Sequence, residues 1–154
     1  PTAENYTDES RKTNDRSCVI KVSAAMHSAL LTADIEALSE GEIVARDASA
    51  IALKSDVLLL PHHGSRTSST PSFIDAVAPK VALINAGYRN RFGHPRADVL
   101  ARYSERNINV LRTDWHGAIT LSSADGFAAI EKFRESRQRY WVDRPDPGDA
   151  RPIE

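Results

Sequence analysis

The chain alternates short apolar runs with stretches of helical periodicity. Runs of strand length predict strands at residues 17–22, 28–32, 56–60, 81–85, 109–112 and 118–121, with 127–133 as a candidate for one more. Between them, apolar residues recur at helical spacing, which predicts helices over 35–46, 72–77 and 96–106. Strands that alternate with helices predict an α/β fold, in which helices flank a mixed sheet.

The runs at 56–60 and 81–85 are almost entirely apolar instead of alternating. Strands of this kind are typical of the centre of a sheet, where both faces are covered. The sequence therefore favours a layered arrangement with helices on both faces of the sheet.

Both ends of the chain are polar. Residues 1–13 predict a flexible lead-in without the apolar segment of a signal peptide. Residues 142–154 mix three prolines and a glycine with charged residues, which predicts a disordered tail. The 154 residues, 41% of them hydrophobic, suffice for one domain with its own core, and no apolar run is long enough to span a bilayer.

Charge limits the classes of partner. With 20 basic and 21 acidic residues, the chain has a net charge of −1 and no overall field that attracts nucleic acid. Arg89, Arg91, Arg96 and Arg102 form either a local basic patch or an ordinary solvated face. A single cysteine, Cys18, excludes an internal disulfide, and its apolar neighbours favour a buried position.

Polar residues with metal-binding chemistry follow the predicted strands. His62 and His63 come directly after the run 56–60, Asp34 follows the run 28–32, and His94 lies in a loop after 81–85. Together they predict a polar site at one edge of the sheet, and imidazole with carboxylate suits zinc or manganese.

Each of these residues also has a simpler interpretation. Asp34 stands where an aspartate often caps the following helix. Because neighbouring side chains of a strand point to opposite faces, only one of the two adjacent histidines is expected to reach a given metal. His94 is either functional or an incidental loop residue.

Hydroxyl groups surround the histidine pair. Ser65, Thr67, Ser68 and Ser69 form either a loop that holds a phosphate or a solvated turn. Asn90 lies in the same loop as His94, where contacts to a phosphate or a leaving group are expected.

Several motifs in one order resemble the carboxy-terminal metallo-β-lactamase-like domain of the ComEC family, the DNA-uptake channel proteins of naturally competent bacteria. The motifs are Asn-Asp-Arg-Ser-Cys-Val (14–19), Leu-Leu-Thr-Ala-Asp-Ile-Glu (30–36), His-His-Gly-Ser-Arg-Thr-Ser-Ser (62–69), Asn-Arg-Phe-Gly-His-Pro (90–95) and Arg-Thr-Asp (112–114), with Arg-Tyr-Trp at 139–141. The resemblance covers roughly residues 14–121 in order and the closing motif at 139–141, which gives a domain segment of residues 14–141. It implies an αββα sandwich with a dinuclear metal site, and a nuclease that degrades one strand of incoming DNA.

The resemblance assigns roles to individual residues. It implies that Asp34 and His63 are metal ligands, that His62 and His94 are catalytic, and that Ser65 and Asn90 bind substrate. In such a site two divalent metals, zinc or manganese, clamp the phosphate and activate a water molecule for in-line attack on phosphorus.

Two departures from the family pattern change the expectation. Glycine usually precedes the aspartate, but here the residue is Ala33, which fits less readily into unusual backbone conformations. The chain also lacks the His-x-His-x-Asp-His motif, whose residues are expected before residue 1. The chain is therefore expected to be the second half of the domain, to bind metal weakly or not at all, and to be catalytically silent alone.

Further expectations concern assembly and location. A half sandwich exposes the apolar face of its sheet, so self-association is expected. The resemblance implies an inner-membrane parent protein, with this domain on the extracytoplasmic side and single-stranded DNA as partner. The alternatives are a non-catalytic module that binds DNA or a partner, and another phosphodiester hydrolase of the metallo-β-lactamase fold, such as a phosphorylcholine esterase.

Overall fold

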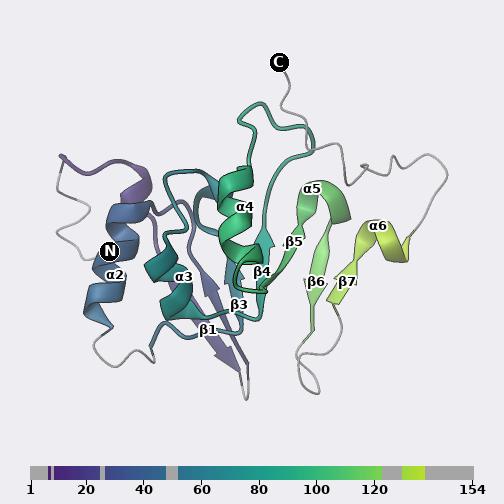
Figure 1. The fold of residues 1–154 in the computed structure, drawn as a ribbon, viewed down its shortest axis with the longest axis horizontal. Helices are drawn as coiled ribbons and strands as arrows, with labels where there is room; N and C mark the ends of the chain where they lie inside the picture. The colour runs from purple at the N-terminus through teal and green to yellow at the C-terminus, as the bar shows by residue number, and fades with distance from the viewer. Residues whose placement is uncertain (1–6, 8, 25–26, 48–51, 123–129, 138–154) are drawn as a thin grey trace.

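A computed structural model of the chain describes residues 7, 9–24, 27–47, 52–122 and 130–137 (Figure 1). Its centre is a five-stranded sheet in the order β1-β2-β3-β4-β5. The strands are β1 (Ile20–Ala24), β2 (His27–Leu31), β3 (Val57–Leu59), β4 (Val81–Ile84) and β5 (Asn109–Arg112). β1 pairs antiparallel with β2, and the later pairings are parallel. The predicted mixed α/β architecture is confirmed.

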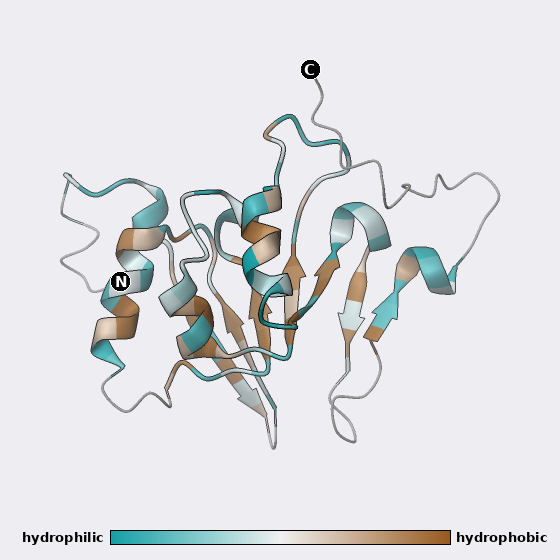
Figure 2. Cartoon of the chain, in the orientation of Figure 1, coloured by the Kyte–Doolittle hydropathy of each residue, from teal (hydrophilic) through white to brown (hydrophobic). Residues whose placement is uncertain are grey.

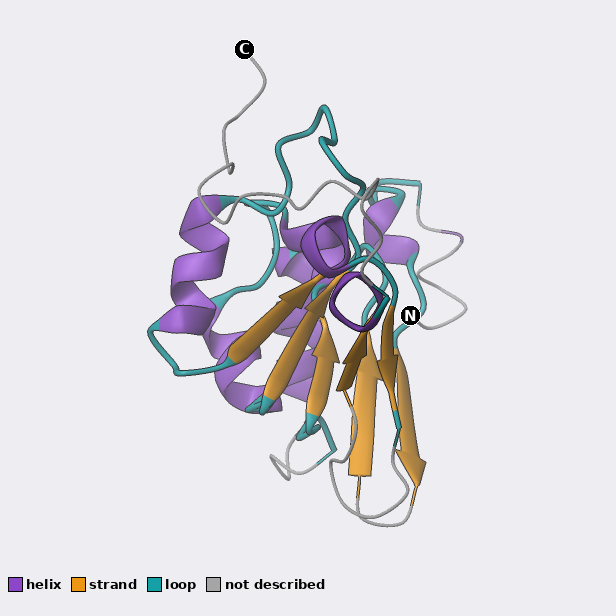
Figure 3. Cartoon of the chain, turned by 90° about the vertical axis from the view of Figure 1, so that its right-hand side faces the viewer, coloured by secondary structure: helices purple, strands orange, loops and turns teal. Residues whose placement is uncertain are grey.

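Three helices connect the parallel strands. α2 (Ala37–Arg46) joins β2 to β3, α3 (Pro71–Val77) joins β3 to β4, and α4 (Ala97–Ser104) joins β4 to β5. Right-handed crossovers that step in one direction across a sheet place their helices on one face. The three helices accordingly lie on one side of the sheet (Figures 1 and 3), rather than on both sides as the sequence favoured.

The core lies between these helices and the sheet. Leu30, Leu58 and Ala82 occupy corresponding positions of β2, β3 and β4 and are at most 2% exposed. They belong to one cluster with buried helix residues, among them Phe73, Ile74, Val77, Val99 and Tyr103. Figure 2 shows hydrophobic residues along the strands and a mixture of hydrophobic and hydrophilic residues on the helices.

The opposite face of the sheet is apolar and open at β1 and β2. Ile20 pairs with Leu31, and successive residues of a strand alternate between faces, so Ile20, Val22 and Leu31 share the face opposite Leu30. Their exposed fractions are 54%, 51% and 39%. Leu111 of β5, in line with Leu31, is only 3% exposed, so the exposure is concentrated at the β1 side.

The element boundaries differ from the sequence predictions at several ends. The predicted helix 35–46 begins at Ala37, because Glu36 has the extended backbone of an N-cap residue. The predicted helix 96–106 ends at Ser104. Of the candidate strand 127–133, residues 127–129 lie outside the described residues and 130–132 form β7.

The remaining elements form a separate small sheet. β6 (Ile119–Leu121) pairs antiparallel with β7 (Ile130–Lys132), and two short helices, α5 (Thr113–His116) and α6 (Phe133–Ser136), accompany them. Within the described ranges, no helix combines the length and apolar character needed to cross a membrane.

Two predictions about the ends of the chain need comment. The predicted tail 142–154 and most of the predicted lead-in, residues 1–6 and 8, lie outside the described residues. The predicted burial of Cys18 is wrong. The residue precedes the outer strand β1 and is exposed, so its apolar neighbours did not indicate a core position.

Candidate functional site

The predicted site residues follow consecutive parallel strands. Asp34 comes after β2, His62 and His63 come after β3, and His94 lies between β4 and α4. Because β2, β3 and β4 run parallel, their carboxyl ends meet at one edge of the sheet, where α/β proteins commonly bind ligands. Motifs that follow successive strands along the chain therefore lie close together in space.

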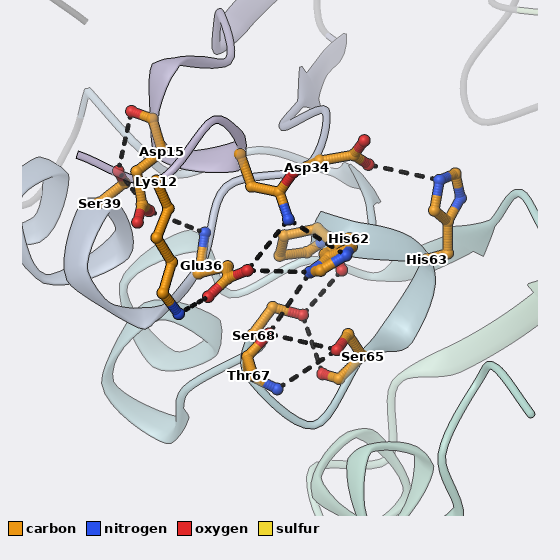
Figure 4. Close-up of polar contacts among 12 residues, drawn as sticks. Lys12, Asp15, Asp34, Glu36, Ser39, His62, His63, Ser65, Thr67 and Ser68 are labelled. Carbon is orange, nitrogen blue, oxygen red and sulfur yellow. Dashed lines mark hydrogen bonds and ion pairs between the residues drawn. The ribbon is translucent and has the colours of Figure 1, made fainter. Parts of the chain in front are cut away.

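His63 and Asp34 face each other (Figure 4). The Nε2 atom of His63 lies 3.3 Å from Oδ1 of Asp34, and the side chains are 47% and 45% exposed. The Nδ1 atom of His63 lies 2.6 Å from the carbonyl oxygen of Asn85. A carbonyl oxygen only accepts hydrogen bonds, so Nδ1 carries a proton and donates it.

This arrangement suits a cation between the two side chains. With a proton on Nδ1, the neutral imidazole presents a lone pair on Nε2 toward a carboxylate oxygen, which is also an acceptor. Either a second proton or a metal ion satisfies both atoms. Two ligands of a tetrahedral zinc ion lie about 3.3 Å apart, close to the separation observed here. A carbonyl that orients the far nitrogen of a histidine is a usual companion of metal ligation.

The turn that carries the histidine pair explains why the two side chains diverge. Residues Pro61–Gly64 form a 3-10 turn in which His62 (φ 49°, ψ 42°) and His63 (φ 54°, ψ 23°) are both left-handed. The pair is not part of a strand, so strand alternation is the wrong reason for the divergence that the sequence analysis expected. Only His63 reaches Asp34.

Ala33 also adopts the left-handed conformation, with φ 49°. Its carbonyl oxygen accepts a hydrogen bond from the backbone N–H of His62 at 3.0 Å, which ties the two site loops together. Left-handed backbone costs a residue with a Cβ atom about 1–2 kcal/mol, whereas glycine adopts it freely. Ala33 thus has the unusual backbone conformation that the sequence raised as a concern, and whether alanine is tolerated there stays a prediction.

Gly64 lets a third loop approach. It has φ 78°, and a Cβ atom at this position would lie 2.7 Å from Cβ of Pro95. The backbone N–H of Arg96 donates to the carbonyl oxygen of Gly64 at 3.0 Å. The glycine thus holds the loop of His94 against the histidine pair.

His62 points into a different set of polar groups (Figure 4). Its Nδ1 atom lies 3.6 Å from Oε1 of Glu36 and 3.4 Å from Oγ1 of Thr67. Its Nε2 atom lies 3.3 Å from Nδ2 of Asn14, which is a donor. Neutral His62 therefore accepts on Nε2 and carries its proton on Nδ1, next to the carboxylate of Glu36.

Glu36 connects the His62 cluster to the start of the chain. Its carboxylate accepts hydrogen bonds from Lys12 at 2.8 Å and from Asn14 at 3.0 Å. Burial alone would raise the pKa of Glu36, but the hydrogen bonds from Lys12 and Asn14 outweigh it and leave the pKa below its ordinary value. Glu36 is therefore a carboxylate at neutral pH.

Asp15, not Asp34, satisfies the amino end of α2. Oδ1 of Asp15 accepts from the backbone N–H of Glu36 at 3.2 Å and from Oγ of Ser39 at 2.8 Å. Asp34 lies outside α2 and faces His63. The capping interpretation of Asp34 is thus replaced by capping from a residue far away in the sequence.

His94 completes a group of three imidazoles. Its ring centroid lies 6.0 Å from that of His62 and 6.1 Å from that of Phe92, which stacks on it. Burial, together with the nearby His62, Arg96 and His63, lowers the pKa of His94 below its ordinary value. Among the described residues, its buried Nδ1 atom has no hydrogen-bond partner.

Asn90 shapes the loop that holds His94. Its Nδ2 atom donates to the carbonyl oxygens of Gly87 at 3.2 Å and His94 at 2.6 Å, and its Oδ1 atom accepts from the N–H of His94 at 3.0 Å. The structure therefore shows a loop-forming role. Substrate binding by Asn90 stays a prediction.

The hydroxyl-rich loop is more enclosed than either sequence interpretation suggested. Ser65, Ser68 and Ser69 are at most 7% exposed, so a fully solvated turn is wrong for them. Ser68 donates to the carbonyl oxygens of Pro61 and Ser65. Thr67 carries the exposed hydroxyl group next to His62. The Oγ atom of the buried Ser65 lies 3.2 Å from Oγ1 of Thr67.

A buried carboxyl group of α2 holds this loop by accepting hydrogen bonds from its backbone. Glu40, which is fully buried, accepts hydrogen bonds from the backbone N–H groups of Ser69 at 2.5 Å and Thr70 at 2.7 Å. Burial raises the pKa of Glu40 despite these bonds. The position of Glu40 within α2 did not indicate this role in the sequence, because a glutamate side chain in a helix usually faces water.

Glu36 and Asn14, which contact His62, were not predicted as site residues from the sequence. Both lie in motifs that carried the family resemblance, which was the available signal. Across the described part of the chain, no group of three or more His, Cys, Asp or Glu side chains is arranged to hold a metal ion. Asp34 and His63 are a pair of candidate ligands, short of the four that a closed zinc site uses.

Comparison with known proteins places this chain in a family. No family model matches the chain. It is 36% identical over 132 residues to competence protein ComA of Neisseria gonorrhoeae, covering 86% of this chain and 19% of that protein. It is 39% identical over 106 residues to ComE operon protein 3 of Bacillus subtilis, covering 69% and 13%. It is 36% identical over 124 residues to recombination protein 2 of Haemophilus influenzae, covering 80% and 15%.

These matches extend over most of the chain but only a small part of each relative. The chain spans 13% to 19% of the length of these three proteins. The chain belongs to the ComEC family of competence proteins and corresponds to one segment of its members.

Proposed function

We propose that this chain contributes part of a metal-dependent phosphodiesterase site in a DNA-uptake protein, where the site degrades one strand of incoming DNA. The fold proposed for the complete domain is the αββα sandwich of the metallo-β-lactamase type, with this chain as its carboxy-terminal half. Membership of a family with competence proteins among its members supports the role in DNA uptake. The same membership supports a membrane-associated parent, and we propose that the parent lies in the inner membrane with this domain on the extracytoplasmic side.

The observation that carries the proposal is the contact between His63 and Asp34. The Nδ1–H group of His63 is committed to the carbonyl oxygen of Asn85, which leaves Nε2 facing Oδ1 of Asp34 at 3.3 Å. Imidazole and carboxylate are ligands for zinc and manganese. A bound divalent ion would supply Lewis-acid chemistry, by withdrawing charge from a phosphate and by making a water molecule more acidic.

The neighbouring residues have complementary tasks. His62 is one proposed catalytic residue: Asn14 at Nε2 and Glu36 beside Nδ1 orient its ring and keep its proton on Nδ1. His94, whose lowered pKa keeps it neutral at pH 7, can accept a proton or a hydrogen bond. Ser65 and Asn90, the predicted substrate contacts, shape the loops on which these histidines lie.

Two ligands alone bind a metal ion weakly, so the remaining ligands are expected from outside the described residues. Calorimetry with Zn²⁺ and Mn²⁺ tests this on the 154-residue chain and on a version extended toward the amino terminus. The extended protein should bind two ions tightly and the chain should bind weakly.

Substitutions identify the ligands. In the extended protein, Asp34→Asn and His63→Ala should each weaken metal binding at least about tenfold. Asp98→Asn is a matched control, because the Asp98 side chain is 44% exposed and the Asp34 side chain 45%. Equal effects of Asp34→Asn and Asp98→Asn would contradict the assignment of Asp34.

A second candidate function is a non-catalytic module that binds DNA or a protein partner. It is favoured by the lack of a complete ligand cluster among the described residues. If neither the chain nor the extended protein binds metal, this alternative replaces the phosphodiesterase.

A further inference from the structure

The loop between β4 and α4 presents two exposed aromatic rings. In residues 87–96, hereafter the arginine–aromatic loop, Tyr88 is 43% exposed and Phe92 is 62% exposed. Arginines lie over both rings: Cζ of Arg91 is 5.1 Å from the centre of Phe92, and Cζ of Arg89 and of Arg134 are 5.2 Å and 5.6 Å from the centre of Tyr88. Tyr88 and Phe92 therefore flank Arg89 and Arg91 along one surface loop.

The positive charge of this loop is not balanced locally. The sequence has no Asp or Glu from residue 76 to residue 97, whereas Arg89, Arg91 and Arg96 fall in that interval. Other arginines of the protein pair with acids, as Arg106 does with Asp75. Over the described ranges, no carboxylate forms an ion pair with any of the three loop arginines.

Hydrogen bonds within the arginine–aromatic loop and at its base fix its conformation. The Asn90 side chain bonds to the backbone of Gly87 and His94, so the turn closes on itself. At its base, Ala86 bonds to Oγ1 of Thr113, and Arg96 bonds to the carbonyl oxygen of Gly64. A surface that is ordered before binding loses less conformational entropy when a ligand arrives.

The loop is continuous with the candidate site. Phe92 stacks on His94 with 6.1 Å between ring centroids, and His94 meets His62 at 6.0 Å. A ligand on Phe92 that extends past His94 thus arrives beside His62 and His63.

We propose that the arginine–aromatic loop is a stacking platform for the unpaired bases of a single-stranded nucleic acid. Tyr88 and Phe92 stack on bases, and Arg89, Arg91 and Arg96 neutralise the phosphates between them. Stacking on aromatic rings beside cationic groups is how proteins hold single strands without regard to sequence. The inference deepens the proposed function, on which it rests for the idea that the strand continues to a cleavage site.

An anionic lipid surface is the competing occupant, because aromatic and arginine side chains also bind headgroups. The ring-to-ring path from Phe92 to the histidines favours the strand. Membrane contact would not require rings directed toward a polar site.

The test is equilibrium binding of the 154-residue chain to fluorescent oligonucleotides, in chelator and without metal. The probes are a 20-nucleotide thymidine strand, an abasic deoxyribose-phosphate strand of equal length and charge, and phosphatidylglycerol vesicles. The thymidine strand should bind more tightly than the abasic strand. Phe92→Ala and Tyr88→Ala should each weaken binding to the thymidine strand by between about fivefold and a hundredfold.

Matched variants separate stacking from hydrophobicity and from charge. Phe92→Tyr should preserve affinity, whereas Phe92→Leu should lose it. Arg91→Ala should weaken binding to the thymidine and abasic strands alike and reduce the salt dependence. Arg46→Ala, at a side chain 56% exposed on α2, should change nothing.

The outcomes discriminate clearly. Equal affinity for the thymidine and abasic strands, or full affinity in Phe92→Leu, would overturn the proposal. Binding to vesicles that requires Phe92, without binding to the thymidine strand, would overturn it in favour of a lipid surface. Because the assay contains no metal, a stacking effect without metal binding by the extended protein would contradict the phosphodiesterase and leave this inference standing.

Discussion

His63 and Asp34 come from loops after different strands, yet Nε2 of the histidine lies 3.3 Å from a carboxylate oxygen of the aspartate. The hydrogen bond from His63 to Asn85 selects the Nδ1–H form of the neutral ring. We therefore expect nitrogen-15 NMR of the chain at alkaline pH to show His63 protonated on Nδ1. Zn²⁺ should shift Nε2 of His63 and disturb the spectrum of His116 little. The signal is assigned with His63→Gln, and an Nε2–H tautomer would contradict the orientation proposed for metal binding.

Ala33→Gly should stabilise the protein by up to about 1.5 kcal/mol. The left-handed backbone costs alanine about 1–2 kcal/mol, and the greater freedom of glycine in the unfolded chain offsets about 0.5–1 kcal/mol of that gain. Urea unfolding measures the change. Ala45→Gly, in α2, is the control and should destabilise the protein by about 1 kcal/mol. A loss of stability in Ala33→Gly as large as in the control would show that the backbone at Ala33 is not strained.

Glu40→Ala should destabilise the protein by about 3 kcal/mol, because it leaves the buried N–H groups of Ser69 and Thr70 without an acceptor. Glu105→Ala, at an exposed position after α4, should change the free energy of unfolding by no more than about 0.5 kcal/mol. Chemical denaturation at pH 7 tests both changes.

The raised pKa of Glu40 also predicts that the stability of the protein depends on pH. Burial raises the pKa of Glu40 above its ordinary value of 4.5. Between pH 4.5 and the raised pKa, the folded protein therefore binds more protons than the unfolded chain. The contribution of Glu40 to stability is therefore fully present below pH 4.5 and declines as the pH rises through the raised value. Glu40→Gln should remove this decline. An identical pH profile in both proteins would show that Glu40 is ionised without cost.

The open sheet face predicts self-association. Ile20 and Val22 are more than half exposed on β1, which is also an edge strand with unpaired backbone groups. Light scattering should show dimers or larger assemblies, and Ile20→Thr with Val22→Thr should shift them toward monomer while keeping β propensity. Leu38→Ala removes an equally exposed apolar side chain, 58% exposed on α2, and should have no effect. A monomeric wild-type chain would contradict the prediction.

Much of the fold followed from local patterns along the chain. The strand 109–112 was predicted with the boundaries of β5, and the predicted helix 72–77 lies within one residue of α3. These elements are short and strongly periodic, so the nearest neighbours in sequence decide them. The positions of Asp34, the histidine pair and His94 after successive strands were likewise readable, because each follows an apolar run of strand length.

Directions and partners of side chains depended on the tertiary structure. Two left-handed residues, not strand alternation, turn His63 toward Asp34 and His62 toward Glu36. The cap of α2 comes from Asp15, and the acceptor for the serine loop comes from Glu40, both more than twenty residues from the N–H groups they satisfy. Such contacts form only when the sheet brings separate segments together, since no local periodicity encodes them. The chemical groups at the edge of the sheet could be read from the order of the motifs along the chain, whereas the packing of distant loops sets which of these groups meet.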